Sequence, residues 1–393
     1  MTTYNFDEII ERRGTDSAKW GYYDPDVIPM FVADMDFRSP QPVIDALVER
    51  IQHGVFGYGM FFNPPPSLSG AIGDWLQRRH GWQVEPEHII VQPNVVNGIY
   101  VAAKAIGEPG DHIMVNTPVY WPFISGAEKA NRPLHMVPLS MVTDGHLRRY
   151  EIDFDALEAA ITPQTKLFLL CNPHNPVGRA FEKWELEKLA EICLRHDIII
   201  CSDEIHGDMV YAPHRHTPIA SIAPEIAART ITLHAASKTF NIAGIGLGYA
   251  IISNPELRQQ FKTVYDSMGV HATLTGYVAT ETAYREGQPW LDALMTYLQG
   301  NRDFVADFVR THFPNVRVTV PEGTYLSWLD FREAGLPGEP CAYFLEHGRV
   351  ALSGNWEMQG YEGFARLNFG CPRPQLQEAL DRLHAAYTQA ERV

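Results

Sequence analysis

The stretch from residue 166 to residue 201 constrains the fold of this chain most strongly. It begins with the apolar run KLFLLC at 166–171, continues through an amphipathic segment at about 182–196, and ends in a second apolar run, DIIIC, at 197–201. Two strand-sized runs joined by a helix predict a βαβ crossover with parallel strands. The helix is expected to bury one face, formed by Leu186, Leu189, Ala190 and Cys193.

The same alternation extends to both sides of this unit. Further strand-like runs lie at 88–91, 112–115, 230–235 and 246–252, with a helix at about 95–106. This pattern predicts an α/β fold, in which a mostly parallel sheet is covered by helices on both faces.

The regular alternation of predicted strands and helices ends near residue 285. Two long amphipathic helices, at about 288–312 and 374–390, flank short strands near 315–319, 324–330 and 364–368. This predicts a smaller α+β domain. The expected organisation is a segment at 1–45 that packs with the small domain, a large cofactor-binding domain at 46–285, and a small domain at 286–393.

Polar side chains follow three of the predicted strands, where each strand ends. They are Asn175, Asp203 and Lys238. The carboxyl ends of parallel strands meet at one edge of the sheet, so these residues should form one site. A lysine that can form a Schiff base, an acid for a pyridine nitrogen and an amide for a ring hydroxyl fit pyridoxal phosphate.

Each of these residues also has an ordinary explanation. Lys238 alone would more often be a surface lysine in a turn, Asp203 could cap a helix, and Asn175 could form an Asx turn. The ordered set at three strand ends favours the cofactor site.

Composition and charge exclude several classes of protein. The net charge of −15, without a lysine- or arginine-rich run, argues against nucleic acid as a partner. The longest apolar runs are too short to cross a bilayer, and the acidic N-terminus does not resemble a signal peptide, so we expect a cytoplasmic protein that does not contact membranes. The five cysteines have no paired spacing, and no metal-binding motif is found among the histidines.

Four motifs carry a family resemblance. NPHNPVG at 172–178, SDEIH at 202–206, ASKTFN at 236–241 and RLNFGCP at 366–372 resemble, in order and spacing, the aspartate-aminotransferase superfamily of pyridoxal-phosphate enzymes (fold type I, class I/II). The resemblance covers essentially the whole chain.

Three further motifs resemble one branch of this superfamily. VADMDF at 32–37, HGVFGY at 53–58 and QPWLDA at 288–293 are similar to the cystathionine β-lyase and cysteine-S-conjugate β-lyase branch.

The resemblance implies roles for the residues of the cofactor site. Lys238 would link covalently to pyridoxal phosphate and later move the Cα proton. Asp203 would pair with the pyridine nitrogen, Asn175 would bond the ring oxygen, and Tyr120 would stack on the ring. His206 stands where common transaminases have a tyrosine, and a histidine there recurs in the lyase branch.

The remaining implied roles concern the phosphate and the substrate. The backbone at Asn94 and Val95, at a helix start, would bind the phosphate together with the Ser237 hydroxyl. Tyr58 would reach the phosphate from the neighbouring subunit of a homodimer. Arg366 would bind the α-carboxylate of an amino-acid substrate in a bidentate pair, near Asn175.

The sequence also departs from the family pattern. Ala235 stands where many relatives have a hydroxyl residue, and Gly246 stands where many have an arginine for the phosphate. The segment at 353–361 differs from the usual proline-glycine loop before the carboxylate arginine. The phosphate site is thus expected to carry less charge, and the side-chain specificity to differ.

The predicted function is a pyridoxal-phosphate-dependent carbon–sulfur β-lyase. It would cleave cysteine S-conjugates such as cystathionine to a thiol, pyruvate and ammonia. An aminotransferase remains open as an alternative, because both reactions begin with removal of the Cα proton. A regulatory protein that retains a cofactor site is a second alternative.

Overall fold

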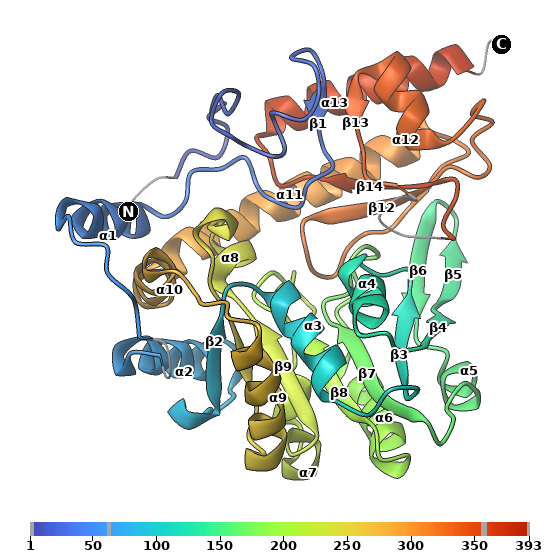
Figure 1. The fold of residues 1–393 in the computed structure, drawn as a ribbon. Coiled ribbons are helices and arrows are strands. Elements are labelled where there is room, and N and C mark those ends of the chain that lie inside the picture. Colours follow the sequence, from blue (N-terminus) through green and yellow to red (C-terminus); the bar gives the residue numbers. More distant parts are fainter. Residues whose placement is uncertain (1–3, 61–63, 355–359, 391–393) are drawn as a thin grey trace.

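The structure of the protein is a computed structural model that describes residues 4–60, 64–354 and 360–390. In Figure 1 the lower part of the molecule is built around one large sheet, and the upper part contains long helices over a second sheet. The N-terminal residues, drawn in blue, run through the upper part before the chain enters the lower one. This arrangement, a helix-covered larger sheet with a smaller part of helices and strands, agrees with the predicted α/β fold class.

The larger sheet forms the centre of the lower part. Within the described residues it has seven strands, in the order β2-β10-β9-β8-β7-β3-β4. Neighbouring strands are parallel, except that β10 is antiparallel to both β9 and β2. In this spatial order the strands cover Ile89–Gln92, Gly248–Ile251, Thr230–His234, Ile199–Asp203, Thr165–Cys171, His112–Thr117 and Leu134–Pro138.

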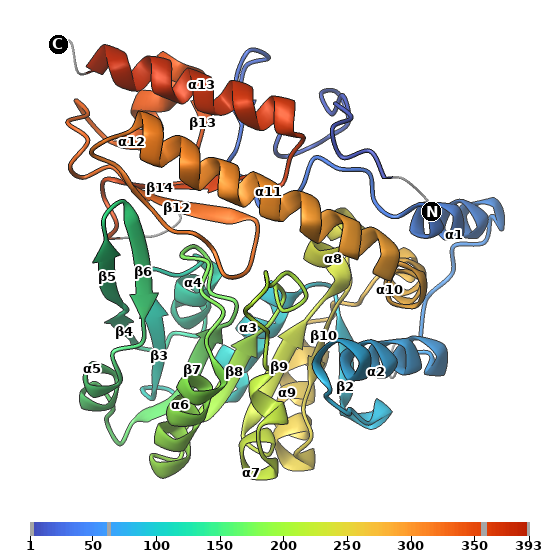
Figure 2. The same ribbon diagram turned by 180° about the vertical axis from the view of Figure 1, so that it is seen from behind.

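The central strands are apolar along most of their length because both faces of the sheet are covered. Helices α3, α4 and α9 cover one face, and α5, α6 and α7 cover the other (Figures 1 and 2). Helix α6 (Lys183–Arg195) begins with a capping box between Glu182 and Glu185. It buries Leu186, Leu189, Ala190 and Cys193, which confirms the predicted helix face.

The other helices complete these layers and the upper part. They are α1 (Gln41–Gln52), α2 (Pro66–His80), α3 (Val95–Ala105), α4 (Pro122–Lys129), α5 (Phe154–Ala159), α7 (Pro224–Ala227), α8 (Ala236–Thr239), α9 (Pro255–Ser267), α10 (Leu274–Glu286), α11 (Gln288–His312), α12 (Pro340–Tyr343) and α13 (Arg373–Ala390). Helices α11 and α13 match the two long helices predicted near the C-terminus. No helix in the described ranges combines the length and apolar character needed to span a membrane.

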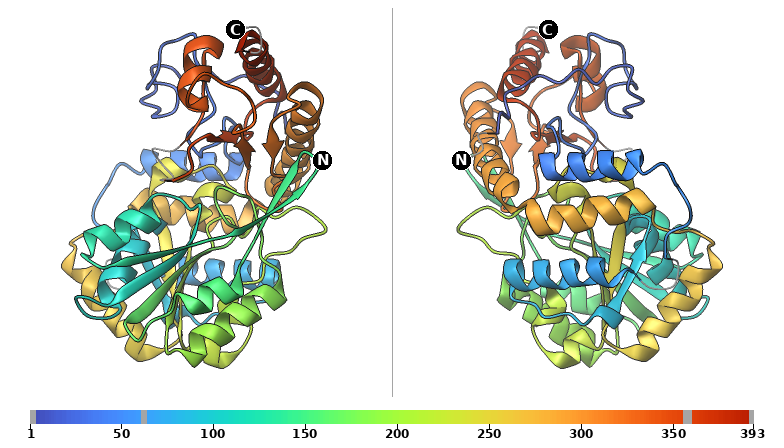
Figure 3. Two further views of the ribbon diagram at one scale, coloured as in Figure 1. Left: turned by 90° about the vertical axis from the view of Figure 1, so that its right-hand side faces the viewer. Right: turned by 90° about the vertical axis from the view of Figure 1, so that its left-hand side faces the viewer.

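The second sheet joins two distant regions of the chain. As far as the chain is described, it has five strands in the order β14-β12-β11-β6-β5. Their bounds are Phe364–Asn368, Leu326–Asp330, Arg317–Val318, Leu147–Glu151 and Ser140–Asp144. The hairpin β5–β6 thus extends the C-terminal sheet from within the range expected to form the large domain, and it rises beside the upper part in Figure 3.

This hairpin and the preceding strand β4 were not predicted from the sequence. Every residue of β5 is exposed, so the strand has no buried face to produce an alternating apolar pattern.

The N-terminal segment also pairs with the C-terminal region. Strand β1 (Ile28–Pro29) runs parallel to β13 (Val350–Ala351). Helix α1 instead contacts α10 in the lower part. Residues 31–36 therefore lie on the path between the two parts of the molecule.

Candidate active site

A cavity of about 250 Å³ lies at the carboxyl ends of the parallel strands. Strands β7, β8 and β9 end at Cys171, Asp203 and His234, and the chain after each strand turns toward the cavity. Every predicted site residue except Tyr58 lines it: Asn94, Val95, Tyr120, Asn175, Asp203, His206, Ser237, Lys238 and Arg366. The edge of the sheet thus brings together residues that are far apart in sequence.

Lys238 lies on a single helical turn, α8, that directly follows β9. The sequence had predicted a turn at this position. The partly buried Nζ atom donates a hydrogen bond of 2.5 Å to the carbonyl oxygen of Ala33, which also accepts one of 2.8 Å from the Tyr325 hydroxyl. The amine therefore points into the cavity from the strand end while a carbonyl from the N-terminal segment orients it.

Asp203 is the last residue of β8 and is buried. Its carboxylate accepts a hydrogen bond of 3.0 Å from the amide of Ile205. Burial raises the pKa of Asp203 to about 7, and the neighbouring Glu204 charge adds to this rise, whereas Lys238 opposes it. A carboxylate in this environment gains most from a cationic partner in the cavity.

His206 lies on the turn that follows Asp203 and is also buried. Burial, followed by the nearby charges of Lys238 and Arg366, lowers the pKa of His206 to about 3. The imidazole is therefore neutral at ordinary pH. Its Nδ1 atom has no hydrogen-bond partner among the described residues, so it is available to a ligand.

Arg366 enters the cavity from β14, opposite the strand ends, and only 1% of its surface is exposed. Its Nη1 atom donates to Asn175 Oδ1 at 3.1 Å. Its Nη2 atom donates to the Phe31 carbonyl at 2.9 Å and to Ser353 Oγ at 3.1 Å. These contacts fix the plane of a guanidinium group that faces the other cavity residues.

The N-terminus of α3 forms a further wall. Asn94 caps the helix by accepting a hydrogen bond of 2.8 Å from the Asn97 amide, and Val95 is the first helical residue. The backbone at Gly248 on β10 packs so closely that an added Cβ would lie 2.9 Å from the carbonyl carbon of Asn94. Glycine at this position lets the helix start approach the sheet, where its amides can bind an anion.

Tyr58 lies away from this cavity. It is 91% exposed. Exposed apolar side chains precede and follow it on α1 and the next segment, namely Val48, Ile51, Val55, Phe56 and Met60. Within one chain, the structure does not bring Tyr58 to the other predicted site residues.

Part of the cavity wall was not predicted from the sequence. Phe31, Val32 and Ala33 line the cavity, although the motif at 32–37 had served only as a sign of family branch and Phe31 had not been singled out. The segment 353–361 was expected to differ from the proline-glycine loop of the family. Residues 355–359 of this segment lie outside the described part of the chain.

A buried polar cluster under α8 was also missed. Candidate ligand atoms of His80, Asp208 and His234 lie within 4.8 Å of one another. The Asp208 carboxylate accepts hydrogen bonds from Trp75, His80 and Thr239, so it anchors the residue that follows Lys238. Burial opposes ionisation of Asp208, but the His80 hydrogen bond and nearby positive charges keep its pKa below the ordinary value. The three residues lie far apart in the sequence, so no local spacing brings them together before the chain folds.

Comparison with known proteins agrees with this geometry. Residues 25–383 match the family model for aminotransferase class I and II. The chain belongs to this family. The family depends on pyridoxal phosphate, and the predicted superfamily and branch are therefore confirmed.

Relatives and solved structures match over nearly the full length. Cystathionine beta-lyase PatB of Bacillus subtilis is 42% identical, over 97% of this chain and 99% of that protein. The structure of cystalysin from Treponema denticola, which contains a pyridoxal 5'-phosphate cofactor, has a TM-score of 0.93 at 34% identity and covers 99% of this chain and 100% of that one. The PLP-bound C-S lyase from Staphylococcus hominis has a TM-score of 0.90 at 32% identity, with 98% of each chain covered.

The cavity of this chain fits the family cofactor. It presents a lysine amine, a buried carboxylate that favours a cationic partner, an amide, an aromatic ring and a helix N-terminus within one enclosed space. These are the groups needed for an aldehyde, a pyridine nitrogen, a ring oxygen, a ring face and a phosphate.

Proposed function

We propose that this protein is a pyridoxal-phosphate-dependent carbon–sulfur β-lyase that cleaves cysteine S-conjugates of the cystathionine type. The observation that carries the proposal is the convergence of Lys238, Asp203, Asn175 and Arg366 on one cavity. Similarity to cystathionine β-lyases and C–S lyases supports this reaction class. The expected products are a thiol, pyruvate and ammonia.

The sheet-edge residues would hold the cofactor. Lys238 would bind its aldehyde carbon, Asp203 its ring nitrogen and Asn175 its ring oxygen. Tyr120 covers the ring, and the neutral His206 offers a further hydrogen-bonding group. The phosphate would lie against the backbone at Asn94 and Val95 and the hydroxyl of Ser237, where the helix dipole favours an anion.

Arg366 would bind the substrate through its α-carboxylate. Its guanidinium is already oriented by Asn175 and the Phe31 carbonyl, so little side-chain entropy is lost when a carboxylate binds. Arg366 and Lys238 line the same cavity, so a substrate held by its carboxylate would lie in the space that the Lys238 amine faces.

Lys238 would then act as the base. When it is displaced by the substrate amine, its Nζ atom removes the Cα proton, and the Ala33 carbonyl limits where the amine can move. When bound, pyridoxal phosphate supplies the electron sink that stabilises negative charge at Cα. Asp203 would support this sink, because its buried carboxylate favours a positive charge at the ring nitrogen. The Cβ–S bond breaks, the thiolate leaves, and the released product hydrolyses to pyruvate and ammonia.

A homodimer would complete the phosphate site. Tyr58 lies on an exposed apolar stretch with Val55, Phe56 and Met60, a surface suited to a second copy of the chain. In such a dimer the Tyr58 hydroxyl would reach the partner's phosphate. That hydrogen bond would partly replace the arginine that many relatives have at the position of Gly246.

An aminotransferase is the second candidate, because the family model that matches this chain includes aminotransferases. Purified enzyme incubated with L-cystathionine separates the two reactions. The lyase predicts thiol and pyruvate in equal amounts over many turnovers. Accumulation of pyridoxamine phosphate without thiol would instead establish the aminotransferase.

A further inference from the structure

Residues 31–36, here called the bridging segment, touch both of the side chains that face the substrate. The Phe31 carbonyl accepts a hydrogen bond from Arg366 at 2.9 Å, and the Ala33 carbonyl accepts one from Lys238 at 2.5 Å. One short stretch of main chain therefore orients the proposed carboxylate-binding group and the proposed base. A shift of this stretch would displace both groups together.

Side chains from both parts of the molecule hold the bridging segment. Asn368, at the end of β14, donates to the carbonyls of Val32 and Asp34 at 2.6 and 2.7 Å. Asn241, just after α8, accepts from the Met35 amide at 3.0 Å and donates to the Met35 carbonyl at 2.9 Å. These contacts are neutral hydrogen bonds with partners far away in sequence.

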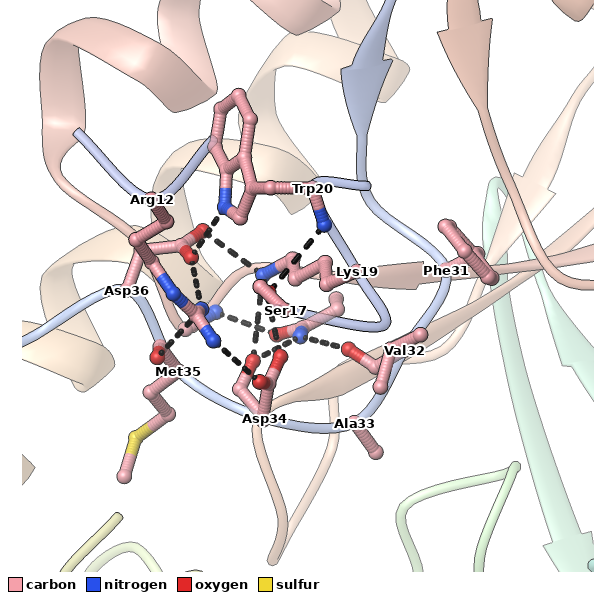
Figure 4. A network of polar contacts seen from close by, with 12 residues as sticks. Arg12, Ser17, Lys19, Trp20, Phe31, Val32, Ala33, Asp34, Met35 and Asp36 are labelled. Atoms are coloured by element: carbon pink, nitrogen blue, oxygen red, sulfur yellow. Dashed lines mark hydrogen bonds and ion pairs between the residues drawn. The ribbon is translucent and has the colours of Figure 1, made fainter. Parts of the chain in front are cut away.

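A charged cluster holds the segment from its other side (Figure 4). Lys19 Nζ lies 2.7 Å from Asp36 Oδ2, and the two residues are only 1% and 3% exposed. Arg12 contacts Asp36 at 2.5 Å and Asp34 at 2.7 Å through its two terminal nitrogens. The Trp20 indole donates to Asp36 Oδ1 at 2.8 Å.

The cluster balances two cations against two carboxylates in a mostly buried place. Gln375 on α13 donates to the second oxygen of Asp36 at 2.9 Å, so the buried carboxylate is bonded from several directions. Lys19 also donates to the Asp34 carbonyl at 3.2 Å, so it bonds the main chain of the bridging segment directly. A buried ion pair adds little net stability compared with apolar packing, but loss of one partner leaves a costly uncompensated charge. Its distinctive effect here is to fix where the segment lies.

We propose that Lys19 and Asp36 are positioning residues for the reaction. Their ion pair, supported by Arg12 and Trp20, sets the bridging segment so that the Phe31 and Ala33 carbonyls hold Arg366 and Lys238 in the cavity. The inference rests on the proposed function in one respect, namely that Arg366 binds an amino-acid carboxylate. Lys19 and Asp36 themselves line no part of the cavity and touch no reacting atom.

The test uses the Lys19→Met variant of the holoenzyme, which keeps the length of the side chain but removes its charge. We expect KM for L-cystathionine to rise by about tenfold to a hundredfold, since small displacements of binding groups have effects of this size. The dissociation constant of glycine, followed by the change in cofactor absorbance, should rise by a similar factor. Hydrogen exchange in the peptide covering the bridging segment should be faster in the cofactor-free protein.

The Arg349→Met variant is the matched control. Arg349 pairs with Asp24 and Asp26 on the surface, and so ties the same N-terminal region to β13 without touching the bridging segment. We expect its KM and exchange to equal those of the wild type. The Trp20→Phe variant, which removes one hydrogen bond to Asp36 and keeps the aromatic packing, should shift both measurements in the same direction by a smaller factor. It serves as the test if Lys19→Met does not fold.

The outcomes separate this inference from the proposed function. A wild-type enzyme that releases no thiol overturns the lyase, but the glycine affinity and the hydrogen exchange still decide the role of Lys19. A lower melting temperature with wild-type KM, glycine affinity and exchange shows a purely structural pair and overturns the inference. Equal losses in the Lys19→Met and Arg349→Met variants overturn it as well.

Discussion

The two walls of the cavity are built in different ways. One wall, at the sheet edge, consists of residues that directly follow strands, among them Asn175, Asp203 and Lys238. The opposite wall combines Arg366 on β14 with the bridging segment near the N-terminus. The first wall depends on local strand geometry, whereas the second depends on contacts between chain regions more than 300 residues apart, as between Arg366 and Phe31.

This difference suggests a division of work. The sheet-edge wall would control the cofactor and therefore kcat, and the opposite wall would control the substrate carboxylate and therefore KM. Substitutions in each wall can break or sharpen this division.

The largest effect is expected from Asp203→Ala. Without the buried carboxylate, the ring nitrogen loses the charge that supports the electron sink, and kcat should fall by about two to three orders of magnitude. Steady-state kinetics with L-cystathionine measure this, with Asp266→Ala as a surface control. A change confined to KM would break the proposed division.

Arg366→Lys should act mainly on KM. Lysine keeps the positive charge but cannot form the bidentate pair, so KM should rise by about 10- to 100-fold while kcat changes much less. The control is Arg148→Lys, since Arg148 pairs with Asp330 in the same sheet but away from the cavity. A normal KM in the Arg366→Lys variant would show that another group binds the carboxylate.

A pH-dependent effect should appear in the cofactor-free protein. Because burial raises the pKa of Asp203 to about 7, folding favours the protonated carboxyl group. This contribution to stability is present below the ordinary pKa of an aspartate and is lost as the pH rises through about 7. The Asp203→Asn variant should therefore melt several degrees above the wild type at pH 8, with a smaller difference at pH 5. Equal differences at both pH values would contradict the assigned environment.

The smallest effect is expected from Tyr58→Phe. Loss of one hydroxyl contact to the phosphate should weaken cofactor binding by about tenfold in the dimer, without changing KM. Equilibrium dialysis of pyridoxal phosphate measures this, and Tyr22→Phe, at another exposed tyrosine, is the control. Unchanged cofactor affinity would remove Tyr58 from the proposed site.

The sheet-edge wall could be predicted because its signals are local. The apolar runs of β7 and β8 are long enough to identify as strands, and their ends place Asn175 and Asp203 without further information. Lys238 was placed correctly after a strand, although the structure puts it on a helical turn where a loop was expected. The motif around Arg366 identified that residue only through family resemblance.

The opposite wall could not be predicted in the same way. Nothing in a single sequence pairs Lys19 with Asp36, because neither the spacing nor the pattern of neighbours differs from that of surface charges. The contact of Lys238 with the Ala33 carbonyl links residues 205 positions apart and involves a backbone atom, which carries no sequence signal. The hairpin β5–β6 was missed because every residue of β5 is exposed and β6 buries only Tyr150, so neither strand shows an alternating apolar pattern.

The covalent attachment site of the cofactor tests the central claim most directly. Reduction of the holoenzyme with borohydride, followed by digestion and mass spectrometry, locates the lysine that carries the pyridoxyl group. We predict the group on Lys238 alone, with no label on the buried Lys19. Label on a different lysine, or full retention of the visible cofactor absorbance in the Lys238→Ala variant, would contradict it.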